Sequence, residues 1–400
     1  MRILYLSDIR FPIERANGIQ TMETAHALAR RGHIVHLGVR PDIVRPPQDP
    51  FAFYGLAADE RLRIERAPIA GPYGLRRFEF LAWAGWRTAR ARDVDVVFTR
   101  DLGVADLLRR VPGRPPLVYE SHGFAPVFAE TLDELVSGAA RARAGKVRRL
   151  IRRERRVWRD ADGYVTTTAV LADELASRFG PRPRVEVVPN GLRFSPDAAP
   201  PAVAAGGRVV LYAGQLYPWK GVDVLLRALA TLPDVAAVIL GGREGDADWG
   251  RIAALSDRLG IRSRVTLAGF VPKAALPARL ADASLFVLPT LDTPSARYTC
   301  PLKMFEYMAC GRPIVASDLP PVREVLTHDV NASLVPPGEP AALAAAIARL
   351  LDDPERGRRL AARARADSAR YTWDRRGARV EAVLTDAVAR RKSRSTRPSH

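Results

Sequence analysis

Short apolar runs alternate along this chain with longer segments whose apolar positions recur every three or four residues. The short runs predict buried strands, and the longer segments predict amphipathic helices. An alternation of strands and helices is typical of βαβ units and a mainly parallel sheet. The expected fold class is therefore α/β.

The pattern divides into two successive series of elements. In the first half, strands are expected at Ile3–Ser7, Ile34–Val39, Val94–Thr99, Leu117–Ser121, Gly163–Thr167 and Val185–Val188. Helices between them are expected at Gln20–Arg30, Val104–Arg110, Ala144–Arg159 and Val170–Arg178. In the second half, strands are expected at Val209–Ala213, Ala236–Gly241, Val265–Ala268, Ser284–Leu288, Pro313–Ala316 and Ala332–Val335, with helices beginning near Val222, Trp249, Lys273, Pro301 and Pro320. Two such series predict two Rossmann-like, doubly wound domains.

A chain of 400 residues is too long for one ordinary core. We expect an N-terminal domain over 1–190, a linker over 191–207 and a second domain over 208–370. A last helix over 371–390 can pack back on the N-terminal domain, and the basic tail 391–400 is expected to be disordered. Ligands of open α/β sheets bind beyond the carboxyl ends of the strands, which predicts a site in a cleft between the two domains.

The composition is that of a globular protein, with 47% hydrophobic and 26% charged residues. No apolar stretch reaches the ~20 residues of a membrane span, and the start of the chain does not have the pattern of a signal peptide. Cys300 and Cys310 are too few for a disulfide framework or a cysteine zinc site. A cytoplasmic location is expected.

The net charge of +18 is concentrated in one segment. Arg141–Arg159 holds ten basic residues and one acid, Glu154, a net charge of +9 and half of the total. Its apolar positions share one helical face that we expect to pack on the sheet, with Glu154 paired to an arginine. The basic face of this helix then serves either as a solvated surface or as a docking site for an anionic membrane. Nucleic acid is not expected as a partner, because the sequence has no basic motif interleaved with aromatic residues. Phe78–Trp86 can add hydrophobic anchoring or pack in the core.

Two segments could hold a phosphate-bearing ligand. Lys220 follows a strand and precedes a helix, where a cation and the helix dipole both favour phosphate, although a solvated lysine explains the position equally well. Pro301 suits the first turn of another helix, whose N-terminal N–H groups can receive a diphosphate. Glu306, over one turn later, can accept hydrogen bonds from a ribose diol. No GxGxxG sequence follows the first strand, so a nicotinamide dinucleotide site is not expected.

The segment from Pro301 to Ser317 reads PLKMFEYMACGRPIVAS. It resembles the donor site of retaining GT-B glycosyltransferases of the large family-four type, the glycosyl transferases group 1. Further stretches agree with that family in order and spacing over nearly the whole chain. They are Asn17-Gly18, Arg31 to His33, Tyr119 to Gly123, Val188 to Gly191, Gly214 to Gly221, Leu240 to Gly242 and Ala268 to Val271.

The resemblance implies a GT-B fold and transfer of a sugar from a UDP- or GDP-sugar, with retention at the anomeric carbon and without a metal or other cofactor. His122 would be the catalytic residue, at the transferred sugar and the acceptor. The diphosphate and sugar would be bound by Gly18, Lys220, Tyr298, Pro301, Leu302 and Lys303. The nucleoside would be bound by Gly269, Phe270, Val271 and Glu306. The acceptor is expected to be a glycan or a lipid-linked molecule, and the basic segment Arg141–Arg159 would place a lipid-linked acceptor at the inner face of the membrane.

Two positions depart from the family pattern. Gln215 stands where an arginine is common, and Tyr298 stands where a glutamate is common, eight residues before Glu306. The change at Gln215 removes a cation, and Lys303 is expected to replace the missing charge. The change at Tyr298 removes an acceptor for sugar hydroxyls.

Two alternative functions stay open. One is a nucleotide-sugar epimerase on the same fold, which would need a carboxylate pair around the sugar, and the other is a non-catalytic polyanion-binding protein.

Overall fold

The computed structural model describes residues 1–43, 46, 48–135, 138–193, 207–271 and 275–395. The chain forms two compact units. Unit 1 comprises Met1–Pro126, Ala144–Gly191 and Trp373–His400, and unit 2 comprises Val127–Arg143 and Leu192–Thr372. Of the expected linker, 194–206 lies outside the described residues, as do the expected helix start at Lys273 and the end of the tail, 396–400.

Unit 1 is built on a parallel sheet of seven strands in the order β3-β2-β1-β4-β5-β6-β7. The strands are β1 Arg2–Phe11, β2 Ile34–Pro41, β3 Leu62–Arg66, β4 Val96–Thr99, β5 Leu117–Ser121, β6 Gly163–Thr166 and β7 Val185–Val187. The helices are α1 Ala16–Arg30, α2 Pro50–Tyr54, α3 Arg76–Ala89, α4 Leu102–Leu108, α5 Ala125–Glu130, α7 Ala144–Asp160, α8 Ala169–Phe179 and α16 Trp373–Ser395. The α5 range continues four residues into unit 2.

Unit 2 is built on a parallel sheet of six strands in the order β10-β9-β8-β11-β12-β13. The strands are β8 Val209–Ala213, β9 Ala236–Leu240, β10 Val265–Gly269, β11 Leu285–Leu288, β12 Ile314–Ser317 and β13 Ser333–Val335. The α-helices are α6 Leu132–Leu135, α9 Val222–Ala230, α10 Ala247–Arg258, α11 Leu276–Ala281, α12 Leu302–Ala309, α13 Pro320–Arg323, α14 Pro340–Asp352 and α15 Pro354–Ser368. Short 3-10 turns are η1 Pro218–Lys220, η2 Arg262–Arg264, η3 Ala296–Tyr298 and η4 Ala369–Tyr371.

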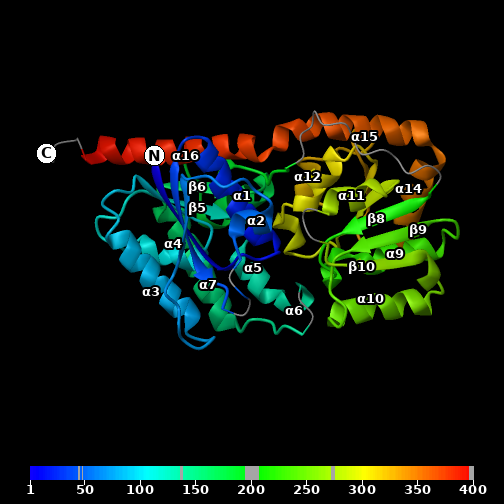
Figure 1. Ribbon diagram of the computed structural model, residues 1–400, viewed down its shortest axis with the longest axis horizontal. Coiled ribbons are helices and arrows are strands. Elements are labelled where there is room, and N and C mark those ends of the chain that lie inside the picture. The colour runs from blue at the N-terminus through cyan, green and yellow to red at the C-terminus, as the bar shows by residue number, and fades with distance from the viewer. Residues whose placement is uncertain (44–45, 47, 136–137, 194–206, 272–274, 396–400) are drawn as a thin grey trace. The chain divides into compact units, whose positions relative to one another are not determined.

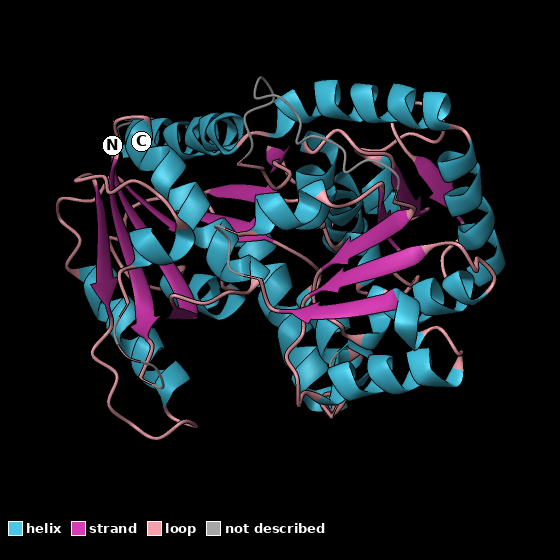
Figure 2. Cartoon of the chain, turned by 45° about the vertical axis from the view of Figure 1, so that its right-hand side comes forward, coloured by secondary structure: helices cyan, strands magenta, loops and turns pink. Residues whose placement is uncertain are grey.

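Both sheets are doubly wound, because the chain starts in the middle of each sheet and moves outward first to one side and then to the other (Figure 1). Helices cover both faces of each sheet (Figure 2). The central strands β4, β11 and β12 are therefore buried along their whole length, which explains their continuous apolar sequences. This architecture is a GT-B fold of two Rossmann-like units, as expected.

The short helices α2, α5 and α6 were not expected, and four larger features of the structure also differ from the sequence expectations. The edge strand β3 was not expected because its sequence, LRIER, carries charged residues. Helix α3 was treated only as an apolar segment. The last helix, α16, continues to Ser395 instead of ending at Arg390, since Arg and Lys propagate a helix well. Val127–Arg143 belongs to unit 2 and not to the N-terminal domain.

Helix α16 belongs to unit 1, although it follows unit 2 in sequence. It packs along α1, where a Cβ on Gly377 would lie 3.0 Å from the Cβ of Ala27. Trp373, at its start, lies against Gly191. The C-terminal segment is thus an integral part of the N-terminal unit.

Among the described residues, no helix is both long enough and apolar enough to cross a bilayer.

Candidate functional site

The carboxyl edge of the unit 2 sheet brings together the loops that follow β8 and β11. These strands are neighbours at the point where the strand order reverses, which is where doubly wound sheets bind ligands. The backbone N–H of Leu291 donates to the carbonyl of Trp219 at 2.9 Å. Gly221 has a φ of +72°, and a Cβ there would lie 1.8 Å from the carbonyl oxygen of Pro289. Only glycine permits this approach, which places the loop bearing Lys220 against the loop after β11.

Lys220 is a partly buried cation at this edge. Its ammonium lies 3.7 Å from the centre of the Trp219 ring, and burial lowers its pKa to about 8. Among the described residues, no carboxylate lies within ion-pair distance of it. A cation that has lost part of its hydration without gaining a carboxylate partner is suited to an anionic ligand.

The N-terminus of α12 is a second group suited to an anion. Pro301 is extended and forms the N-cap, one position before the helix, and no side chain caps the first N–H groups, which begin at Leu302. The helix is anchored by Tyr307, whose ring stacks on Phe286 at 4.3 Å and whose hydroxyl accepts a hydrogen bond from the backbone N–H of Ala213 at 2.6 Å. Ala213 is the last residue of β8, so α12 is fixed to the strand that leads into the Lys220 loop.

Glu306 and Lys303 form an ion pair across one turn of α12. The Lys303 ammonium lies 2.6 Å from a Glu306 carboxylate oxygen, and both side chains are partly buried. Lys303 is therefore already compensated, and a ligand would have to share or displace this contact. Tyr298 lies in η3, just before the helix, and is half-buried, whereas the side chain of Gln215 is exposed.

The end of β10 offers an apolar surface. The backbone N–H of Gly241 donates to the carbonyl of Gly269 at 2.7 Å, which aligns the ends of β9 and β10. Phe270 is 45% exposed, and Arg243 lies over its ring with 5.9 Å between guanidinium carbon and ring centre. Val271 packs into the core beside it. An exposed ring at the carboxyl edge can stack on a nucleoside base.

In unit 1, Gly18 and His122 occupy the carboxyl edge of the sheet. Gly18 lies in the first turn of α1, where a Cβ would stand 2.5 Å from both the Ile13 carbonyl and the Tyr54 hydroxyl. Close packing within unit 1 alone thus explains why this position is a glycine. No contact of Gly18 bears on a ligand.

His122 lies beside a buried polar cluster. Its Nε2 is 3.3 Å from Oε1 of Glu120, which has no exposed surface. Burial and the nearby guanidinium of Arg100 lower the pKa of His122 to about 4, and Glu120 offsets this only in part. The imidazole is therefore neutral near pH 7, and it can exchange hydrogen bonds with a sugar or acceptor hydroxyl without carrying a charge.

Three members of this cluster were missed by the sequence analysis. Gln20 donates to Glu120 at 3.1 Å, Arg100 donates to Gln20 and to the carbonyl of Asn17, and Arg376 forms an ion pair with Glu120. Gln20 lies two positions after the Asn17-Gly18 motif, which was a usable signal. No sequence signal indicated the contact between Arg376 and Glu120, which are 256 positions apart.

The expectation that Glu154 pairs with an arginine is wrong. Glu154 has no exposed surface, and among the described residues no arginine lies within ion-pair distance of its carboxyl group. Arg153 and Arg156 instead pair with Asp106 of α4. Burial, opposed by the hydroxyl of Tyr119, raises the pKa of Glu154 to about 8.

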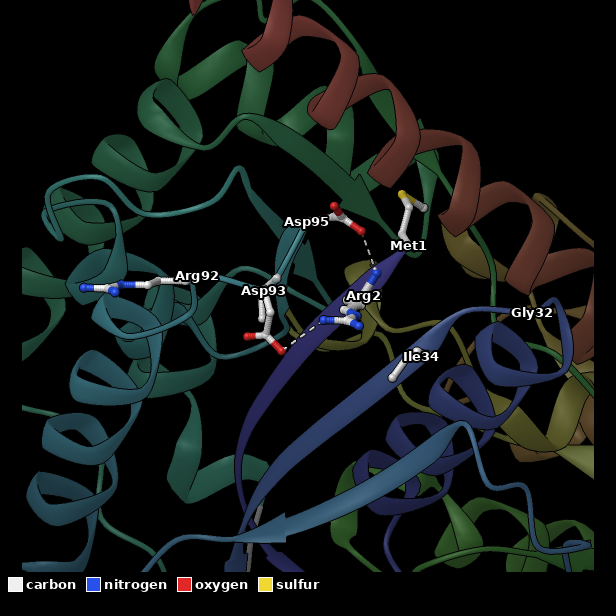
Figure 3. Close-up of a pocket in the computed structure, with 8 residues that line it drawn as sticks. Met1, Arg2, Gly32, Ile34, Arg92, Asp93 and Asp95 are labelled. Atoms are coloured by element: carbon white, nitrogen blue, oxygen red, sulfur yellow. Dashed lines mark hydrogen bonds and ion pairs between the residues drawn. The ribbon is translucent and has the colours of Figure 1, made fainter.

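A cavity of about 430 Å³ lies at the opposite, amino edge of the unit 1 sheet. Arg2 begins β1 there; its backbone N–H donates to Asp95 and its guanidinium to Asp93 (Figure 3). These polar groups therefore bind one another, and the cavity does not lie at the carboxyl edge of the sheet.

Among the described residues, no group of three or more His, Cys, Asp or Glu side chains could hold a metal ion.

Sequence comparison covers both units. Residues 207–353 match the family described as glycosyl transferases group 1, and residues 18–191 match the glycosyl transferase 4-like domain. The D-inositol 3-phosphate glycosyltransferase of Xylanimonas cellulosilytica is 30% identical over 415 residues, which cover 94% of this chain and 93% of that protein.

Solved structures share the fold. Sucrose-phosphate synthase from Thermosynechococcus elongatus superposes with a TM-score of 0.80 at 20% identity, covering 97% of this chain and 99% of that one. Anabaena HepE in complex with UDP-glucose superposes with a TM-score of 0.69 at 20% identity, covering 98% and 100%. With both halves matched to family models and a full-length relative at 30% identity, the chain belongs to the family-four type of glycosyltransferases, the glycosyl transferases group 1, and is an enzyme that transfers glycosyl groups.

Proposed function

We propose that this enzyme transfers a sugar from a nucleoside-diphosphate sugar to an acceptor hydroxyl, with retention at the anomeric carbon. The observation that carries the proposal is Lys220, a partly buried ammonium with a lowered pKa and no carboxylate partner among the described residues, at the switch point of the unit 2 sheet. The uncapped start of α12 supports it, because it adds N–H groups at the same edge.

The expected residues other than Gly18 each have a role in this proposal. The donor diphosphate is bound by Lys220 and the N–H groups that follow Pro301, with Tyr298 beside the sugar. Glu306 accepts from the ribose hydroxyls once Lys303 turns toward the diphosphate, and Phe270 stacks on the base between Gly269 and Val271. The UDP-glucose complex of HepE favours UDP over GDP as the first donor to test.

Retention is explained by attack on the face that the leaving group departs from. The acceptor oxygen bonds to the anomeric carbon as the bond from that carbon to the phosphate oxygen breaks, and the acceptor proton passes to the departing phosphate. The protein then mainly stabilises negative charge on the diphosphate, which a cation and helix N–H groups can do without a metal. Neutral His122 binds a hydroxyl of the sugar or of the acceptor, and when it binds the acceptor hydroxyl it can relay that proton to the departing phosphate.

The acceptor is part of the same proposal. The curated relative from Xylanimonas cellulosilytica is named for D-inositol 3-phosphate, so that compound is the first acceptor to test, followed by glycans and lipid-linked sugars. A cytoplasmic location is also proposed, consistent with two buried cysteines that form no disulfide.

The test is release of nucleoside diphosphate from UDP- and GDP-sugars, with analysis of the sugar product. We expect steady release that depends on the acceptor and falls at least 100-fold when Lys220→Met and Glu306→Gln are combined. Arg227→Ala, which removes an exposed cation on α9, is the matched control and should leave the rate unchanged. Undiminished turnover in the double variant would exclude this site.

The product identifies the rival functions. A free or nucleotide-bound sugar with inverted configuration at C2 would indicate an epimerase. Binding of nucleotide with no turnover of any donor would indicate a non-catalytic protein. Thermal stabilisation by UDP, GDP and ADP, compared at equal concentrations, identifies the base, because a ligand of the native state raises the melting temperature.

A further inference from the structure

Large hydrophobic side chains are exposed on this protein mainly in one place. Seven are exposed among the described residues, and four of them lie between Tyr73 and Trp86. Tyr73 is 85% exposed, Phe78 76%, Leu75 55% and Trp86 52%. Single exposed apolar residues are ordinary, whereas a local group of them marks a surface that contacts something else.

Helix α3 is apolar on two opposite sides. Its inner side, with Phe80, Ala84 and Thr88, is buried. Its outer side exposes Phe78, Ala82, Trp86 and Ala89, which recur at intervals of four, four and three residues and so form one stripe along the helix. The inner side is explained by the unit 1 core. The outer stripe has no counterpart within unit 1.

Two arginines of this segment lie over exposed rings, and Arg77 and Arg87 pair with carboxylates of unit 1. The guanidinium of Arg90 lies 4.7 Å from the ring centre of Trp86, and that of Arg76 lies 5.6 Å from the ring centre of Tyr73. The segment from Tyr73 to Asp93 holds five arginines against Glu79 and Asp93, a net charge of +3. Aromatic rings with arginines beside them are suited to the boundary between lipid headgroups and acyl chains.

The basic helix α7 extends the same layer of unit 1. Helix α4 packs against both α3 and α7, and all three lie in one layer beside the sheet (Figure 1). Lys146, Arg148, Arg149 and Arg152 are exposed on α7, and none has an ion-pair partner among the described residues. We call the stripe of α3 and this row of α7 the α3–α7 surface.

We propose that the α3–α7 surface docks on an anionic lipid bilayer, with Tyr73, Phe78 and Trp86 at the headgroup boundary and the α7 cations on lipid phosphates. Charge decides the occupant. A second copy of the chain would bring a surface of the same positive sign against the first, and the +18 chain has no excess of acids to offer. A bilayer supplies many negative charges and an apolar layer together.

The experiment is flotation of the purified protein with phosphatidylcholine vesicles that contain either no phosphatidylglycerol or a large fraction of it. We expect binding only to the anionic vesicles, weakened by high salt. Phe78→Ser combined with Trp86→Ser should lower the bound fraction on the order of tenfold, as should Arg148→Gln with Arg149→Gln and Arg152→Gln. Val330→Ser, an exposed hydrophobic residue of unit 2, is the matched control and should bind as the wild type does.

Wild-type flotation that is unchanged by either set of substitutions would overturn the proposal. The proposal would also be overturned if the wild-type protein did not bind vesicles but formed a dimer, measured by analytical ultracentrifugation, that Phe78→Ser with Trp86→Ser abolished. Thermal melting shows that the variants are folded, and donor turnover with a soluble acceptor should be unchanged in all of them. This activity measurement separates a failure of the docking proposal from a failure of the proposed sugar transfer.

Discussion

Replacing Glu154 by glutamine tests whether the buried face of the basic helix carries a neutral carboxyl group. Glu154 has no exposed surface, and neither of its oxygens makes a hydrogen bond of good geometry in the described structure. Glutamine has nearly the same shape and cannot ionise. The substitution therefore removes the titration of the side chain and changes its packing little.

The magnitude follows from the pKa. In the unfolded chain the carboxyl titrates near 4.5, and in the folded state burial raises its pKa to about 8. The folded state thus binds the proton more tightly, and its stability falls as pH rises between these two values. The loss is about 1.4 kcal/mol for each pH unit, approaching about 5 kcal/mol at pH 8. Above pH 8 and below pH 4.5 no further change arises from this residue.

Calorimetry of wild type and Glu154→Gln between pH 5 and 9 measures this difference. For a unit of roughly 200 residues, the variant should gain about 3–5 °C in melting temperature relative to wild type for each pH unit up to 8. Glu60→Gln, an exposed glutamate of unit 1, should show no pH-dependent difference. A difference between Glu154→Gln and wild type that is the same at every pH would refute the reasoning, because Glu154 would then not titrate in this range.

Three further outcomes concern the proposed site. UDP affinity, measured by calorimetry, should fall by up to about tenfold between pH 8 and 9 as Lys220 loses its proton, and Lys220→Met should abolish this dependence. His122→Ala should lower kcat about 10²–10⁴-fold, while wild-type kcat/KM stays flat from pH 6 to 7, below the range in which Lys220 titrates, because the imidazole is already neutral. Lys303→Ala should weaken donor binding; unchanged affinity and rate would remove Lys303 from the diphosphate site.

The sequence predicts an element well where burial on two sides leaves a continuous apolar run. The bounds of β5 and β8 agree with the expectation to the residue, since each segment opens with adjacent apolar residues and is too short for a helix. Strand β3 was missed because an edge strand can be charged, and its residues Arg63 and Glu65 conceal its period. Helix α3 was missed because it is apolar on two sides, which blurs the helical period.

The grouping of the residues that we propose to bind the donor was predictable because it depends on local features. A strand, a loop and a helix start follow one another near Lys220 and again near Pro301, and parallel pairing brings such ends to one edge. The ion pair of Lys303 with Glu306 is also local, at a separation of three residues on α12. It was overlooked because each side chain had been assigned to a ligand and not to the other.

The cluster around His122 was not predictable, because its essential cation comes from the other end of the chain. Arg376 is 3% exposed and binds Glu120, Thr24 and the carbonyls of Val188 and Pro189, so it joins α16 to three separate segments of unit 1. Arg376→Met leaves Glu120 buried without its partner and should cost about 3–5 kcal/mol, measured by the melting of unit 1. Exposed Arg375, its neighbour on α16, gives the control variant Arg375→Met. Equal melting of the two variants would mean that α16 is held by its apolar contacts alone.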